Sequence, residues 1–88
     1  MDIAERDKMI DELHIAADEL FAYLPAEDIN CFKELVDHSE IGVGLEILLT
    51  QIDEYDLIIP KKTYNILKNC GRGHIDDCYC DRIKYTES

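Results

Sequence analysis

The segment SEIGVGLEILLTQIDEYDLIIP, from Ser39 to Pro60, carries a strongly apolar helical pattern. Its apolar residues recur every three or four positions, the spacing that places side chains on one face of an α-helix. Ser39 is predicted to be the N-cap, Glu40 stands where the helix dipole favours an anion, and Pro60 is predicted to end the segment. We therefore expect a central helix whose buried stripe consists of Ile41, Leu45, Leu48, Leu49, Ile52 and Tyr55.

Three further helices are predicted, two before this segment and one after it. Helical spacing of apolar residues extends from about Asp2 to Leu24, where Pro25 would end the helix, and again over Ala26–His38 and Lys61–Cys70. Leu57–Ile59 is expected to be a short extended linker that closes one end of the bundle. Residues 72–88 are compatible with a last helix or with a frayed terminus. The prediction is one all-α domain, residues 1–88, built as a small bundle of four to five short helices.

The charge of the chain is large, negative and unevenly distributed. The formal net charge is −11, from 20 acidic and 9 basic residues. Residues 1–59 contain only Arg6, Lys8 and Lys33 as basic residues, whereas six of the nine basic residues fall after position 59. Such a field repels nucleic acid and anionic lipid and attracts basic proteins. A protein partner is therefore expected, and nucleic acid is excluded as a partner.

Membrane insertion and secretion are not expected from this sequence. No apolar run approaches the roughly 20 residues that a membrane-spanning helix needs. The N-terminal residues MDIAERDKMI carry charges of both signs and lack an apolar signal core. We therefore expect a cytoplasmic protein with no membrane partner.

Four cysteines, Cys31, Cys70, Cys78 and Cys80, are expected to be free thiols in a reducing compartment. A zinc site would have to use Cys70, His74, Cys78 and Cys80. Their spacing matches neither paired CxxC motifs nor CxxC followed by HxxxH. We therefore predict no metal and no cofactor, and keep a metal-dependent module on these four residues as a third hypothesis.

Catalytic motifs are not recognisable in the sequence. It contains no HExxH, P-loop, GxGxxG or nucleophile-elbow pattern. Cys70 and His74 could form a nucleophile and base, but no third residue that would orient them is evident. His14 and His38 suit ordinary structural roles. The prediction is that the protein is not an enzyme.

Two acidic segments are the candidates for binding a partner. The run Asp53-Glu54-Tyr55-Asp56 places three carboxylates around one aromatic ring, a composition suited to a basic groove. The turn Asp37-His38-Ser39-Glu40 adds two carboxylates one helix length away. An ordinary solvated helix end and loop would have the same composition. The predicted partner-binding residues are Asp53, Glu54, Tyr55, Asp56, Asp37 and Glu40.

Over residues 10 to 70 the sequence resembles the MafI family of small bacterial immunity proteins. The matching features are Glu40, Ile41-Gly42, Gly44-Leu45-Glu46, Ile47-Leu48, Glu54-Tyr55-Asp56 and Ile59 before a lysine-rich helix start. Residues 71–88, which include Cys78-Tyr79-Cys80, do not match the family pattern.

The resemblance implies a small helical protein that binds and neutralises the toxin domain of a sibling effector. Toxins partnered with this family are often nucleases, including RNA-cleaving enzymes of the EndoU class. The resemblance therefore further implies a nuclease of that class as the toxin. Inhibition would follow from occupation of a basic active-site cleft or from blocked access of the substrate. The alternative hypothesis is an acidic regulatory adaptor that binds a basic cellular protein.

Overall fold

A computed structural model describes residues 3–87, so Asp2, where the first helix was predicted to begin, lies outside the described residues. The described chain is mostly helical, which confirms the predicted small helical bundle. None of its helices combines the length and the apolar character needed to cross a membrane. In chain order the elements are α1 (Ile3–Leu20), α2 (Ala26–Asp37), α3 (Ile41–Glu54), β1 (Ile58–Ile59), α4 (Lys61–Gly71), α5 (Cys78–Asp81) and β2 (Lys84–Tyr85).

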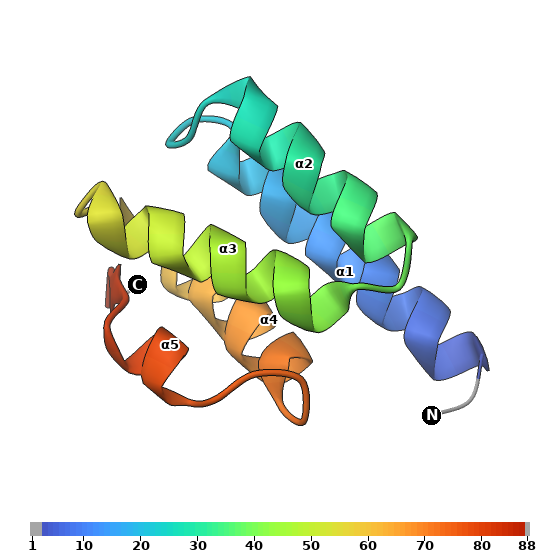
Figure 1. Cartoon of the computed structure of the whole chain (residues 1–88). Helices are drawn as coiled ribbons and strands as arrows, with labels where there is room; N and C mark the ends of the chain where they lie inside the picture. The colour runs from blue at the N-terminus through green and yellow to red at the C-terminus, as the bar shows by residue number, and fades with distance from the viewer. Residues whose placement is uncertain (1–2, 88) are drawn as a thin grey trace.

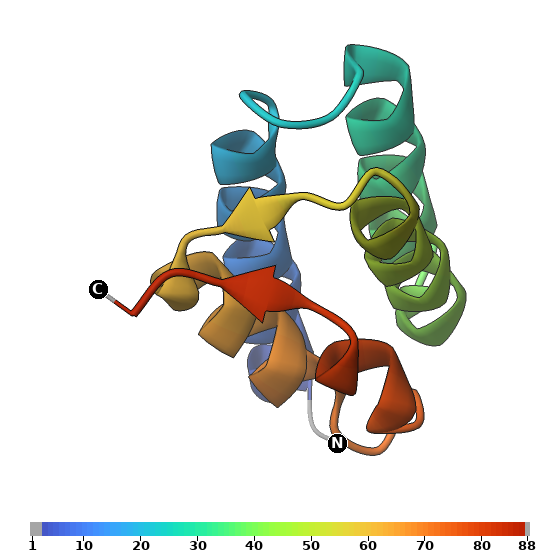
Figure 2. The same ribbon diagram turned by 90° about the vertical axis from the view of Figure 1, so that its left-hand side faces the viewer.

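The first three helices run back and forth, and α4 packs beneath them (Figure 1). α2 contacts both α1 and α3, while α4 contacts α1 and α3 and the short α5 lies against α3. Figure 2 shows the two short strands side by side at the end of the bundle where α3 ends and α4 begins. The strands are parallel, and Ile58 pairs with Lys84 while Ile59 pairs with Tyr85.

The apolar stripe of α3 is the centre of the core, as predicted. Its side chains pack with buried residues of α1, α2 and α4. Burial of one such aliphatic side chain contributes about 1.5–3 kcal/mol. Tyr55 is the exception, because the helix ends at Glu54 and leaves the Tyr55 side chain 53% exposed. The buried members of the stripe are Ile41, Leu45, Leu48, Leu49 and Ile52.

Two glycines let neighbouring segments approach α3 closely. A Cβ atom on Gly44 would lie 3.3 Å from the Leu35 Cβ of α2. A Cβ atom on Gly42 would lie 2.9 Å from the backbone oxygen of His74, in the loop after α4. The helix-propensity cost of these glycines, about 1 kcal/mol each, is therefore offset by contact with both neighbours.

Helices α2 and α3 end in the same way, and this corrects the predicted boundaries. Ser39 and Asp56 adopt left-handed backbone conformations with φ of 66° and 54°. After each, a backbone N–H reaches back into the helix, from Glu40 to the Leu35 oxygen (2.8 Å) and from Leu57 to the Ile52 oxygen (3.1 Å). This is a Schellman motif. Ser39 therefore terminates α2 and does not cap α3, and α3 ends six residues before Pro60.

The end of α1 also differs from the prediction. The helix was expected to continue to Leu24, yet it ends at Leu20. The N–H groups of Tyr23 and Leu24 both bond to the Leu20 oxygen, at 2.9 and 3.0 Å, which tightens the chain into a turn. The turn keeps Leu24 buried and leaves Tyr23 exposed, so that α2 can start directly after Pro25.

The predicted last helix of the C-terminal segment is present as the short α5, whereas the pairing of the residues after it with β1 was not predicted. α5 is a single turn, and Ile83 after it is buried. The ring of Tyr85 stacks on Tyr64 with centroids 4.2 Å apart, and the Thr86 N–H donates to the Ile59 oxygen at 3.0 Å. Ile59 is buried as the predicted plug, whereas Ile58 of the same linker is exposed.

Replacement of Ser39 by glycine is expected to stabilise the protein. A left-handed conformation is unfavourable for an L-residue with a Cβ atom, and glycine is the usual residue at this position. We expect Ser39→Gly to raise the free energy of unfolding by about 0.5–1 kcal/mol in urea denaturation. Ser39→Ala is the matched control, since it retains the Cβ atom. Equal stability of the two variants would contradict the assigned role.

Candidate partner-binding surface

The C-terminal turns of the first three helices carry acidic residues where helix stability would favour basic ones. None of these described helices has a basic residue in its last turn. An exposed carboxylate beside the negative end of a helix dipole is unfavourable by about 0.3–1 kcal/mol. Helix stability therefore does not explain these charges. The carboxylates nearest the three helix ends belong to Asp18, Glu19, Glu34, Asp37, Asp53 and Glu54.

Most acidic helix ends gather at one end of the bundle. α1 and α3 end, and α2 begins, at the end that faces the viewer in Figure 2. α4 begins at this end as well, so its first two residues, Lys61 and Lys62, lie at the same end of the bundle. We call this region the acidic end and define it by Asp18, Glu19, Glu27, Asp28, Asp53, Glu54 and Asp56.

Apolar side chains are exposed in the segments that form the acidic end. Tyr23 lies in the α1–α2 turn, Tyr55 follows α3, and Ile58 and Tyr85 belong to the strands. Their exposed fractions are 39%, 53%, 55% and 37%. Tyrosine is enriched among the residues that dominate protein–protein binding energy, and anions around it select a basic partner. This combination makes the acidic end the candidate binding surface.

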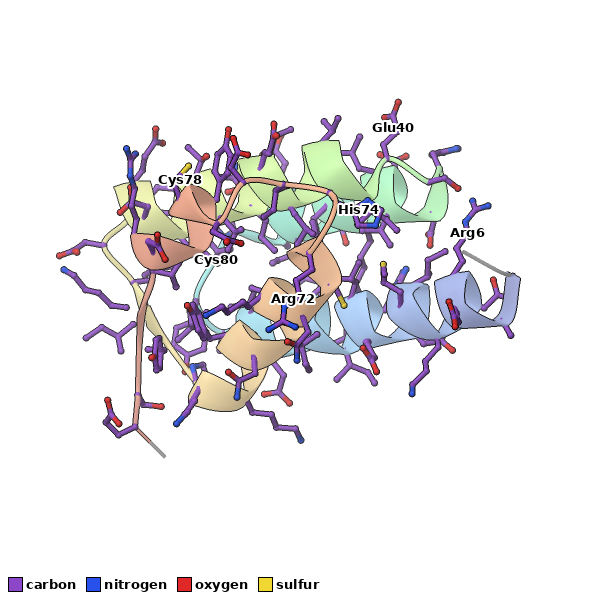
Figure 3. The ribbon with its side chains drawn as sticks, turned by 90° about the horizontal axis from the view of Figure 1, so that it is seen from below. Arg6, Glu40, Arg72, His74, Cys78 and Cys80 are labelled. Carbon is purple, nitrogen blue, oxygen red and sulfur yellow. The ribbon has the colours of Figure 1, made fainter. Side chains whose placement is uncertain are left out.

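The predicted partner-binding residues fall into two separate groups. Asp53, Glu54, Tyr55 and Asp56 lie together at the acidic end, whereas Asp37 and Glu40 flank the turn before α3. Figure 3 shows Glu40 at that opposite end of α3. The 14 residues of α3 separate the two groups by roughly 20 Å at the helical rise of 1.5 Å per residue.

Two of the predicted residues have partners within the chain. The carboxylate of Asp37 lies 2.8 Å from Nε2 of His14 and so ties α2 to α1. The Asp56 carboxylate accepts a hydrogen bond from the Lys84 ammonium, and this bond, together with the charge of Asp56, raises the pKa of Lys84. Asp56 therefore anchors β2, and Glu54 and Tyr55 are the better placed residues for contact with a partner.

Sequence reasoning missed Tyr23 and Ile58. Tyr23 was assigned to the first helix and Ile58 to the linker that closes the bundle. Their exposure at the acidic end depends on which helix ends meet there in the folded chain. Tyr23 stands two residues before Pro25, where the chain was predicted to reverse. Because loops run over the protein surface, this position was a local signal that Tyr23 is exposed. The exposure of Ile58 had no comparable signal in the sequence.

The four cysteines do not form a metal centre in the described chain. Cys31 and Cys78 are exposed, and Cys70 and Cys80 are buried. Figure 3 shows His74 well away from Cys78 and Cys80, at the other end of the loop before α5. Across residues 3–87, no three His, Cys, Asp or Glu side chains are grouped closely enough to hold a metal ion. The zinc hypothesis therefore has no donor cluster among these residues.

The Cys70 thiol lies in an environment that opposes ionisation. Burial raises its pKa to about 12, and the nearby Glu12 carboxylate acts in the same direction. Its Sγ atom lies 3.7 Å from Oε2 of Glu12. Because the thiolate is the nucleophilic form, Cys70 is protected from electrophiles in the folded protein.

Comparison with protein-family models, with curated proteins and with solved structures finds no match to this chain. Its function must therefore be inferred from its own residues. The resemblance of residues 10 to 70 to MafI immunity proteins remains a hypothesis.

The cysteines are expected to differ sharply in reactivity. In the native protein at about pH 8, near the pKa of a free thiol, iodoacetamide should modify Cys31 and Cys78 and leave Cys70 intact. Mass spectrometry of proteolytic peptides would measure this, and the unfolded protein, in which Cys70 also reacts, is the control. Native Cys70 that reacts as fast as Cys78 would contradict the assigned environment.

The raised pKa of Cys70 also fixes the sign of a pH effect on stability. The folded state holds the thiol proton more tightly than the unfolded state, whose pKa is near 9.0. The contribution of Cys70 is therefore complete below about pH 9 and is lost as the pH rises toward 12. Cys70→Ser, compared with the parent chain in denaturant titrations, should show a weaker loss of stability over that range.

Proposed function

We propose that this protein is an immunity protein that binds and neutralises a bacterial toxin domain, a nuclease of the RNA-cleaving class, through its acidic end. One observation carries the proposal: acidic residues occupy the C-terminal turns of α1 and α3, both at the acidic end, against the helix dipoles. Asp18 is paired with the Lys33 ammonium of α2, whereas Asp53 and Glu54 oppose the dipole of α3 with no ion-pair partner among the described residues. A charge that lowers stability in this way is expected where function has selected it.

The chemistry of a nuclease fits such a surface. An enzyme that cleaves RNA needs a basic cleft to hold the phosphate backbone. Carboxylates at the acidic end would take the place of phosphates in that cleft, and Tyr55 would supply an apolar anchor among them. The charge of −11 would also accelerate association with a cationic partner above the neutral range of about 10⁵–10⁶ M⁻¹s⁻¹.

An acidic adaptor for a basic cellular protein would use the same surface. The two functions differ in the consequence of binding, because an immunity protein abolishes a toxic activity whereas an adaptor leaves its partner active or redirects it.

The proposal predicts that an effector with a toxin domain is encoded beside the gene for this protein, and it is tested by co-expression with that domain. We expect a stable complex on size-exclusion chromatography, protection of cells from growth arrest, and loss of RNA cleavage by the purified toxin. A complex that leaves the toxin active would favour the adaptor. The absence of both complex and protection would refute the proposed function.

Charge reversal at Glu54 is expected to separate binding from stability. Glu54→Lys places a cation at the negative end of α3, so the free energy of unfolding should rise by about 0.3–1 kcal/mol. The same change removes a carboxylate from the acidic end, and we expect affinity for the toxin to fall at least about tenfold, or 1.4 kcal/mol. Urea denaturation and calorimetric titration would measure the two effects.

Glu34→Lys is the matched control. Glu34 is exposed in the last turn of α2, at the opposite end of the bundle, so its reversal changes net charge and helix-dipole energy in the same sense. Affinity should be nearly unchanged in this variant. Equal weakening by both substitutions would show that net charge alone drives binding, and an unaffected Glu54→Lys would place the contact elsewhere.

A further inference from the structure

A groove runs along α3 on the side that faces the chain between α4 and β2. Three adjoining recesses form it, with volumes of about 380, 300 and 180 Å³ in order along α3. The first and second share Glu46, and the second and third share Thr50 and Tyr79. Because neighbouring recesses share lining residues, they make one continuous depression, which is shallow over the first two recesses and deeper at the third.

The chemistry of the groove changes from one end to the other. The first recess is mainly polar and contains the carboxylates of Glu46 and Asp76. In the second recess, the apolar lining residues are Ile47 and Tyr79. The third combines the apolar Leu49 and Tyr79 with the opposite charges of Asp53 and Arg82. A ligand matched to this order would carry a cation at one end and apolar groups at the other.

The spacing of the recesses fits an extended peptide. Glu46, Thr50 and Asp53 follow one another at three- and four-residue intervals, so successive recesses are about one helical turn, or 5.4 Å, apart. Alternate side chains on the same side of an extended chain are about 6.6 Å apart. Three alternate side chains of such a segment can therefore reach three successive recesses.

The wall opposite α3 is held in place by the core. Tyr79 is partly buried and packs against core residues, and α5 contacts α3. The Gly42 position, where a Cβ atom would meet the His74 backbone oxygen at 2.9 Å, fixes the start of that wall against α3. The thin trace of this loop beside α3 is visible in Figure 3, between His74 and Cys78. The groove is thus formed before any partner binds.

We propose that this groove binds an extended segment of a protein partner in which an arginine or lysine and two apolar residues stand at three alternate positions, with the cation at one end of the three. The cation would occupy the recess of Glu46 and Asp76, and the apolar side chains would contact Ile47 and Tyr79. The inference rests on the proposed function only for the identity of the protein that carries the segment, which would be the toxin domain itself.

The test uses the full-length chain and two synthetic pentapeptides, Arg-Ser-Leu-Ser-Phe and its reverse sequence, with blocked termini. Amide chemical shifts of ¹⁵N-labelled protein are followed during titration with each peptide. We expect one of the two orders to shift resonances of Glu46, Thr50, Asp76 and Tyr79. The peptide with glutamate in place of arginine should bind at least about fivefold more weakly, because it meets two carboxylates.

A double variant and a matched control make the site assignment specific. Glu46→Gln with Asp76→Asn removes both charges of the first recess without changing side-chain shape, and should weaken the arginine peptide at least about threefold. Asp7→Asn with Asp11→Asn removes two exposed carboxylates of α1 and should leave affinity unchanged. Shifts confined to the acidic end, absence of binding, or equal affinity of both double variants would overturn the proposal.

This outcome is distinguishable from failure of the proposed function. If neither peptide binds while Glu54→Lys weakens the toxin complex, the groove is refuted and the immunity function stands. If a peptide binds in the groove and the co-expressed toxin forms no protective complex, the groove stands and the immunity function is refuted.

Discussion

Burial of the α3 stripe is the interaction on which the rest of the fold depends. Ile41, Leu45, Leu48 and Ile52 are buried along the whole length of the helix, and α2, α4 and α5 all pack around it. Gly44 brings α2 close enough to complete this packing. Since one face of α3 is committed to the core, its remaining face and its C-terminal end are what the helix can offer to a partner. Both candidate binding surfaces lie there.

The distribution of charge works against the stability that this core provides. Carboxylates at three helix ends oppose the helix dipoles, and an excess of 11 negative charges adds repulsion throughout the molecule. A small domain has little stability to spare, because it buries a modest fraction of its surface. A basic partner at the acidic end would reduce the charge repulsion and the dipole penalty at the ends of α1 and α3, so binding there would also stabilise the folded chain.

The sequence was sufficient to predict where the helices lie, but it was insufficient to predict the residues at which they end. Helical periodicity located α2, α3 and α4 and the buried stripe from Ile41 to Ile52, since local spacing determines which residues share a helix face. It placed Ser39 wrongly, because a Schellman turn usually uses glycine, and a serine before an acidic residue is equally typical of an N-cap. The pairing of Lys84 and Tyr85 with β1 joins residues about 26 positions apart, and no local pattern encodes such a contact.

The chain after α4 contributes to both candidate binding surfaces, so it bears on which partner the protein selects. It supplies Asp76, Tyr79 and Arg82 to the groove, and Lys84 and Tyr85 to the border of the acidic end. α3 provides the other wall, formed by Glu46, Thr50 and Asp53. A partner that contacts both walls of the groove would therefore bind residues beyond position 70 as well as residues of α3. Discrimination between similar partners requires contacts that differ between otherwise similar binders. In the proposed groove, the C-terminal segment is the wall that can supply such contacts without altering the helical core.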